Sequence, residues 1–134
     1  MSGDNWVKRR DNLEANIPDA WNLICISIEQ AATAFAYTRY ARERKSICVA
    51  RRINDCVHMV IAPVSGGPSE ETFDICLDRK KHRVFSRHET VEKASLKFVA
   101  DSQDKAVLVG KDGSQLTEDQ ASEFFMKSFL FPEG

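Results

Sequence analysis

The sequence lacks the features that would tie it to a membrane or to a secretory route. No stretch approaches about 18 uninterrupted apolar residues, and the richest one, "AWNLICISIEQAATAFAY", is broken by Asn22, Glu29 and Gln30. The opening segment, "MSGDNWVKRRDNLEANIPD", has no apolar run followed by a small-residue cleavage site. We therefore expect no secretory signal and no membrane contact.

Cysteine patterns that bind metals or form redox motifs are also missing. Cys25, Cys48, Cys56 and Cys76 make no C-x-x-C pair, and no H-x-x-x-H spacing lies near them. Each lies in an apolar run, where a free thiol behaves as a small hydrophobic residue. The sequence thus predicts four reduced, buried thiols, no metal and no cofactor, in a cytoplasmic protein.

No catalytic motif stands out either. His58 and Cys56 could form a base and a nucleophile, but residues two apart on a strand lie about 6.6 Å apart, beyond hydrogen-bond reach. No carboxylate is fixed beside them by the sequence pattern. We assign no catalytic residue, and the sequence favours a protein that is not an enzyme.

The composition predicts one globular domain that spans residues 1–134. Hydrophobic residues make up 43% of the chain and charged residues 29%, which is ordinary for a soluble folded protein. The formal net charge is −1, so the molecule as a whole has no basic field to hold nucleic acid. A polyanion site would have to be a local patch.

A long helix is expected over residues 18–43, after an N-terminal arm or short helix at 1–17. Pro18 suits a first helical turn, and apolar residues then recur at helical spacing at Trp21, Ile24, Ile28 and Phe35. A second apolar stripe lies beside the first and has no obvious cover within the chain. Because exposed apolar patches mark interfaces, this stripe is a candidate interface: Leu23, Ile26 and Tyr37.

The period of the apolar pattern changes from 3.6 to 2 over residues 46–110, which predicts three antiparallel hairpins. A C-terminal helix at 117–131 begins with a capping box formed by Thr117 and Gln120. The order of elements predicts an α+β domain. It would have a single antiparallel meander sheet of about six strands, flanked by a long N-terminal helix and a short C-terminal helix.

The stretch "DRKKHRVFSRH", from Asp78 to His88, is strongly basic. In the expected hairpin Arg83 faces Asp78, and the next arginine of the strand, Arg87, faces Asp74, so both are matched by opposite charges. The cations left over, with two arginines from the basic run at 39–52, form a candidate polyanion patch: Arg51, Arg52, Arg79, Lys80 and Lys81.

Three functions remain open from the sequence. The first is a non-catalytic interaction protein that binds a protein partner or a second copy of itself through a helix or sheet surface. The alternative is a binder of nucleic acid or phosphate ligands that uses the basic runs 39–52 and 79–88. A second alternative is a small-ligand pocket or an enzyme site under the sheet.

Overall fold

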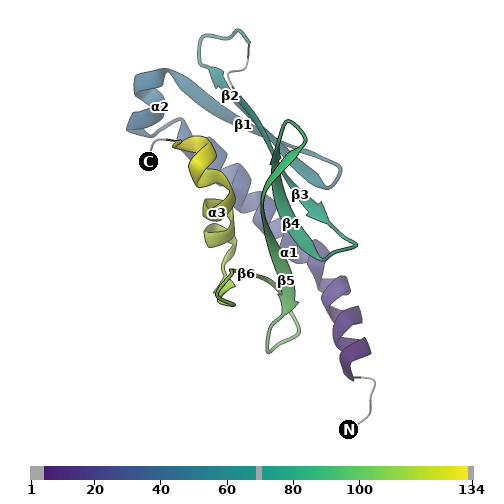
Figure 1. Ribbon diagram of the computed structural model, residues 1–134. Helices are drawn as coiled ribbons and strands as arrows, with labels where there is room; N and C mark the ends of the chain where they lie inside the picture. The colour runs from purple at the N-terminus through teal and green to yellow at the C-terminus, as the bar shows by residue number, and fades with distance from the viewer. Residues whose placement is uncertain (1–4, 69–70, 133–134) are drawn as a thin grey trace.

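Helix α1 (Asn5–Phe35) lies across one face of a curved antiparallel sheet (Figure 1). The computed structural model describes residues 5–68 and 71–132. The elements that follow α1 are α2 (Arg39–Arg44), β1 (Ser46–Ile53), β2 (Cys56–Pro63), β3 (Glu71–Asp78), β4 (Arg83–His88), β5 (Val91–Ala100), β6 (Ala106–Val109), β7 (Gln115–Leu116) and α3 (Glu118–Leu130).

The sheet is a meander in which each strand pairs with the next along the chain, from β1 to β7. The predicted α+β class and antiparallel meander are confirmed. Within the described residues the sheet has seven strands rather than about six, because the two-residue strand β7 pairs with β6 through Leu108 and Leu116. Helix α3 begins at the predicted capping box of Thr117 and Gln120.

Helix α1 begins earlier and ends sooner than the sequence pattern indicated. It starts at Asn5, so Pro18 lies inside the helix and not in its first turn; residues 1–4 of the expected arm lie outside the described residues. After Phe35 the chain turns, and Thr38 caps the separate helix α2 by accepting the N–H of Ala41. Burial of Ile17 and Trp21 on either side of Pro18 offsets the missing hydrogen bond at the proline.

The core lies between the inner face of the sheet and the two helices α1 and α3. The predicted core residues of α1 are all buried: Trp21, Ile24, Ile28 and Phe35. They pack against Val57, Met59, Ile75, Val84 and Phe98 of the sheet. Helix α3 closes this core, and the ring of Phe129 stacks on Phe73 of β3 with their centroids 4.8 Å apart.

The hairpin registers agree with the expected ones in the middle of the sheet only. Asp78 pairs with Arg83 and Asp74 with Arg87, as expected. A loop over residues 53–55, as the sequence indicates, would place Ile47 opposite Ile61, but the β1–β2 loop has two residues and Ile47 faces Ala62. A loop over residues 101–104 would place Val109 opposite Leu96, but Val109 faces Lys97.

Truncation of Phe35 tests the α1 packing. The side chain is 2% exposed and its ring contacts Tyr40 and Phe131. We expect Phe35→Ala to lower the free energy of unfolding by about 3–5 kcal/mol, since it leaves a cavity in the core. Tyr37→Ala, at an aromatic residue that is 72% exposed, is the matched control; urea titrations that gave equal losses for both would contradict this packing.

The β4–β5 turn holds two non-glycine residues in the left-handed region. His88 pairs with Val91, and the two loop residues between them, Glu89 and Thr90, have φ of 50° and 72°. Such a turn favours Asn-Gly, and a β-branched residue is especially strained there. Replacing Glu89 and Thr90 by Asn and Gly should raise the unfolding free energy by about 1–2 kcal/mol.

The control for this replacement is the same Asn-Gly pair at Lys80 and Lys81, neither of which has a positive φ. Thermal or urea unfolding should show a gain for the β4–β5 variant and none for the control. A gain in both would show that strain relief is not its source.

Candidate interaction surfaces

The structure divides the predicted polyanion patch between opposite faces of the sheet. Arg52 lies on the helix side, where its guanidinium donates to both carboxylate oxygens of Glu29 and to Asn22 at 2.7–3.0 Å. This hydrogen bonding with Glu29 raises the pKa of Arg52. Arg51 is the preceding residue of the strand, and it lies on the outer face, opposite His58 of β2.

Arg79 is also matched by a carboxylate. Its guanidinium donates to both oxygens of Asp55 at 2.8 and 2.9 Å, which joins the β3–β4 turn to the β1–β2 turn. Hydrogen bonding from Arg79 lowers the pKa of Asp55. Of the five predicted cations, Lys80 and Lys81 line one basic surface with cations from other segments, and Arg79 lines an adjoining depression that shares Lys80.

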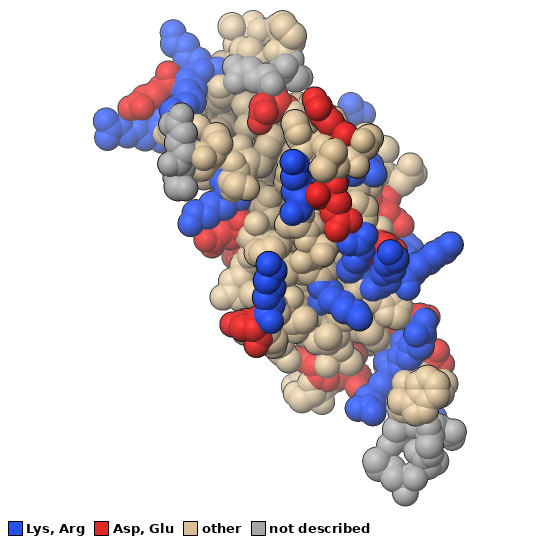
Figure 2. All heavy atoms as spheres, viewed as in Figure 1, with Lys and Arg blue, Asp and Glu red and all other residues tan. Residues whose placement is uncertain are grey.

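That surface is a shallow depression of about 470 Å³, which we call the basic hollow; it is lined mainly by Arg10, Lys80, Lys81, His82, Arg83 and Lys97. Figure 2 shows Lys and Arg side chains gathered near the β3–β4 turn and the N-terminal half of α1, with acidic side chains among them. Sequence reasoning missed Arg10 and Lys97. Only the alternation of β5 hinted at an outward Lys97, and no pattern placed α1 beside this turn.

Ion pairs fix the floor of the basic hollow. Arg83 lies between Asp78 and Glu92, with N···O distances of 3.3 and 2.9 Å. The ring of His82 lies 3.1 Å from a carboxylate oxygen of Glu14 on α1. These contacts hold the β3–β4 turn against α1.

The three candidate interface residues are all exposed, but Tyr37 lies on a different segment from the other two. Leu23 and Ile26 lie on α1 and are 49% and 38% exposed, whereas Tyr37 lies in the turn after α1. Next to them runs a groove of about 560 Å³ between α1 and α3, which we call the helix groove. Its apolar lining is Ala31, Ala34, Phe35, Met126 and Leu130.

Polar contacts join the two walls of the helix groove. The Ser27 hydroxyl of α1 donates to the carboxylate of Asp119 on α3 at 2.6 Å, and its oxygen lies 3.0 Å from that of Ser122. The groove is further edged by Gln30, Glu123 and Lys127. Hydrogen bonds thus hold the two walls together, while the floor of the groove is apolar.

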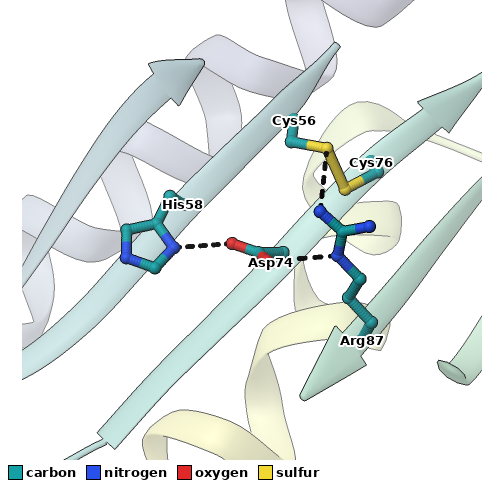
Figure 3. Close-up of polar contacts among 5 residues, drawn as sticks. All are labelled: Cys56, His58, Asp74, Cys76 and Arg87. Carbon is teal, nitrogen blue, oxygen red and sulfur yellow. Dashed lines mark hydrogen bonds and ion pairs between the residues drawn. A yellow bond between two sulfur atoms is a disulfide. The ribbon is translucent and has the colours of Figure 1, made fainter. Parts of the chain in front are cut away.

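The outer face of the sheet carries a ladder of charged residues beside a disulfide (Figure 3). Asp74 accepts from Arg87 at 3.2 Å, and its other oxygen lies 2.6 Å from Nδ1 of His58. Cys56 and Cys76, which are directly paired across β2 and β3, form the disulfide. The Arg87 guanidinium reaches 3.9 Å from the sulfur of Cys56.

The expectation of four free thiols is therefore wrong for Cys56 and Cys76. The disulfide was not predicted because the sequence does not fix the β2–β3 register across the loop after Pro63. The expectation of free thiols holds for Cys25 and Cys48, whose pKa values burial raises to about 12 and about 11. Disulfides persist mainly in oxidising compartments, which weakens the argument from reduced cysteines on which a cytoplasmic location rested.

The disulfide also bears on whether His58 and Cys56 could act as a base and a nucleophile. A carboxylate does orient this ring, contrary to the sequence-based expectation, but the sulfur of Cys56 is bonded to Cys76 and is not a free nucleophile. Among the described residues there is no cluster of His, Cys, Asp and Glu suited to a metal ion. The feature nearest to the second alternative, a small-ligand pocket, is a cleft of about 350 Å³ where α1, β6 and the start of α3 meet.

Reduction of the disulfide should destabilise the fold measurably. The two cysteines are 20 residues apart in sequence, and closing a loop of this length contributes about 3 kcal/mol through the unfolded state. We expect a loss of this size in urea titrations with a reductant. A Cys25→Ala/Cys48→Ala variant should keep the difference between oxidised and reduced protein, and a Cys56→Ala/Cys76→Ala variant should abolish it.

No helix in the described part is long and apolar enough to cross a membrane. No protein-family model, no curated protein and no solved structure matches the sequence or the fold.

Proposed function

We propose that this protein is a self-assembling interaction protein, in which the N-terminal arm of one copy docks in the helix groove of another. The arm consists of residues 6–12 of α1. The observation that supports this proposal is that one chain carries both an exposed helix end with two apolar side chains, Trp6 and Val7, and a groove between two helices with an apolar lining.

The arm is a helix without a surface to pack on. Its residues are all exposed, the first fully buried side chain of α1 being Ile17, and Figure 1 shows α1 extending beyond the sheet at this end. Trp6 and Val7 are 66% and 42% exposed. Two helical turns are marginal in water on their own, so the apolar side chains of the arm gain stability by docking.

The helix groove matches such an arm in shape. From Ser27 to Phe35 its wall on α1 is about 12 Å long at 1.5 Å per residue, or about two helical turns. Ala31 and Ala34 are small and let another helix approach closely, above the buried side chains of Phe35, Met126 and Leu130. An amphipathic helix laid in an apolar groove is a common mode of recognition.

Charge complementarity favours a second copy as the occupant. The arm contains Lys8, Arg9 and Arg10 with a single acidic residue, Asp11. The groove is edged by Asp119 and Glu123, with one cation, Lys127. We infer that Lys8 of the docked arm lies beside Glu123 while Trp6 covers the apolar floor. Reciprocal docking closes a two-fold dimer, and one-way docking builds longer chains.

Charge reversal across the contact tests this assembly. At tens of micromolar, light scattering should give a mass above the 15.2 kDa of one chain. Trp6→Ala, Lys8→Glu and Glu123→Lys should each lower that mass, because each removes apolar burial or places like charges together. The double variant Lys8→Glu/Glu123→Lys should restore association, and Lys93→Glu, on β5, is the control.

Two results would refute the proposal. One is a mass of 15.2 kDa at every concentration for the unmodified chain. The other is an assembly that Ile26→Glu dissolves while Trp6→Ala leaves it intact, since the interface would then be the outward stripe of α1. Circular dichroism of each variant shows whether it has folded.

A further inference from the structure

We propose that the basic hollow is a binding site for a compact, multiply charged phosphate compound, one that carries at least two phosphate groups. Its cations come from three segments that are distant in sequence: Arg10 of α1, Lys80 and Lys81 of the β3–β4 turn, and Lys97 of β5. The packing of α1 on the sheet brings them together around one concave surface.

The charge that remains for a ligand resides in three ammonium groups. Lys80, Lys81 and Lys97 form no ion pair with any described residue. Arg83 and His82 are already held by carboxylates, and Arg10 lies 3.3 Å from Glu14. Five Lys and Arg side chains of the hollow stand against three neighbouring carboxylates, those of Glu14, Asp78 and Glu92, so a net charge of about +2 remains, carried mainly by the three lysines.

Hydrogen bonds fix the backbone of the β3–β4 turn before any ligand binds. His82 has a φ of 51°, in the left-handed region, and its carbonyl accepts the N–H of Phe98 at 2.8 Å. The N–H of Lys81 donates to the side chain of Asp78 at 3.1 Å. A turn fixed in this way loses little conformational freedom on binding, which favours affinity.

The separate ammonium groups favour a compact polyanion over a single phosphate or carboxylate. Glu14, Asp78 and Glu92 lie close by and repel any anion, so the ligand must gain more from the lysines than it loses to these carboxylates. A ligand with two phosphates can contact three separate ammonium groups at once, whereas a monoanion cannot. The volume of about 470 Å³ suits a small molecule, and the Ser95 hydroxyl in the lining can donate to a phosphate oxygen.

A nucleic-acid strand is a poorer fit for the same surface. Single-strand binders stack bases on aromatic rings that interleave with the positive groove. The nearby Phe85 is covered by the guanidinium of Arg83, which lies 4.8 Å from the ring centroid. The formal net charge of −1 also gives no wider field to follow a long backbone.

Calorimetric titration with inorganic pyrophosphate tests the site, with orthophosphate and a short single-stranded oligonucleotide as the other ligands. We expect a Kd for pyrophosphate below about 1 mM, with binding to orthophosphate at least about tenfold weaker. The variant Lys80→Ala/Lys81→Ala/Lys97→Ala should weaken pyrophosphate binding by about tenfold or more, because it removes the three lysine charges.

The matched control is Lys45→Ala/Lys105→Ala/Lys111→Ala, which removes three lysines that do not line the hollow. An equal loss in both triple variants, or no binding by the unmodified protein, would overturn the proposal. Tighter binding of the oligonucleotide than of pyrophosphate would also overturn it and would identify a nucleic-acid interface. Glu123→Gln, in the helix groove and outside the lining of the hollow, should leave pyrophosphate binding unchanged, which separates this site from self-assembly.

Discussion

The burial of one face of α1 against the inner face of the sheet is the interaction on which both proposed surfaces depend. Apolar residues from Ile17 to Phe35 make this contact along much of the helix. The N-terminal half of α1 thereby comes to the β3–β4 turn, where Glu14 meets His82. The C-terminal half lies beside α3, where Ser27 meets Asp119. One helix thus completes the basic hollow at one end and the helix groove at the other.

The two faces of the sheet are stabilised by different physical means. The inner face is covered by helices and is held by apolar burial, which contributes about 25 cal/mol per Å². The outer face has no such cover in the described part of the chain, so its strands are joined by cross-strand charge pairs and by the disulfide. The pair of Asp74 and Arg87 is typical, and it contributes a fraction of what a buried aliphatic pair contributes.

Local patterns predicted the elements, and long-range packing determined the sites. Thr117 and Gln120 marked the start of α3 because a capping box is local, and Asp78 with Arg83 marked a hairpin because a short turn fixes its own register. Arg52 and Arg79 were placed in a polyanion patch because their carboxylates are distant in sequence: Glu29 lies on α1 and Asp55 in another turn. Lys97 was not predicted as part of a basic surface because its neighbours in the hollow, such as Arg10 and Lys80, are also distant in sequence.

Pro18 divides α1 into two parts with different dynamics. A proline has no N–H, so the carbonyl of Glu14 receives no helical hydrogen bond at that point. The core holds the helix from Ile17 onward and Leu13 packs against it, whereas the arm is held by its own backbone bonds and by surface contacts such as that of Asn12 with Asp104. We therefore expect the arm to open locally before the rest of the helix does. Amide protection in the arm then becomes a measure of whether a partner occupies it.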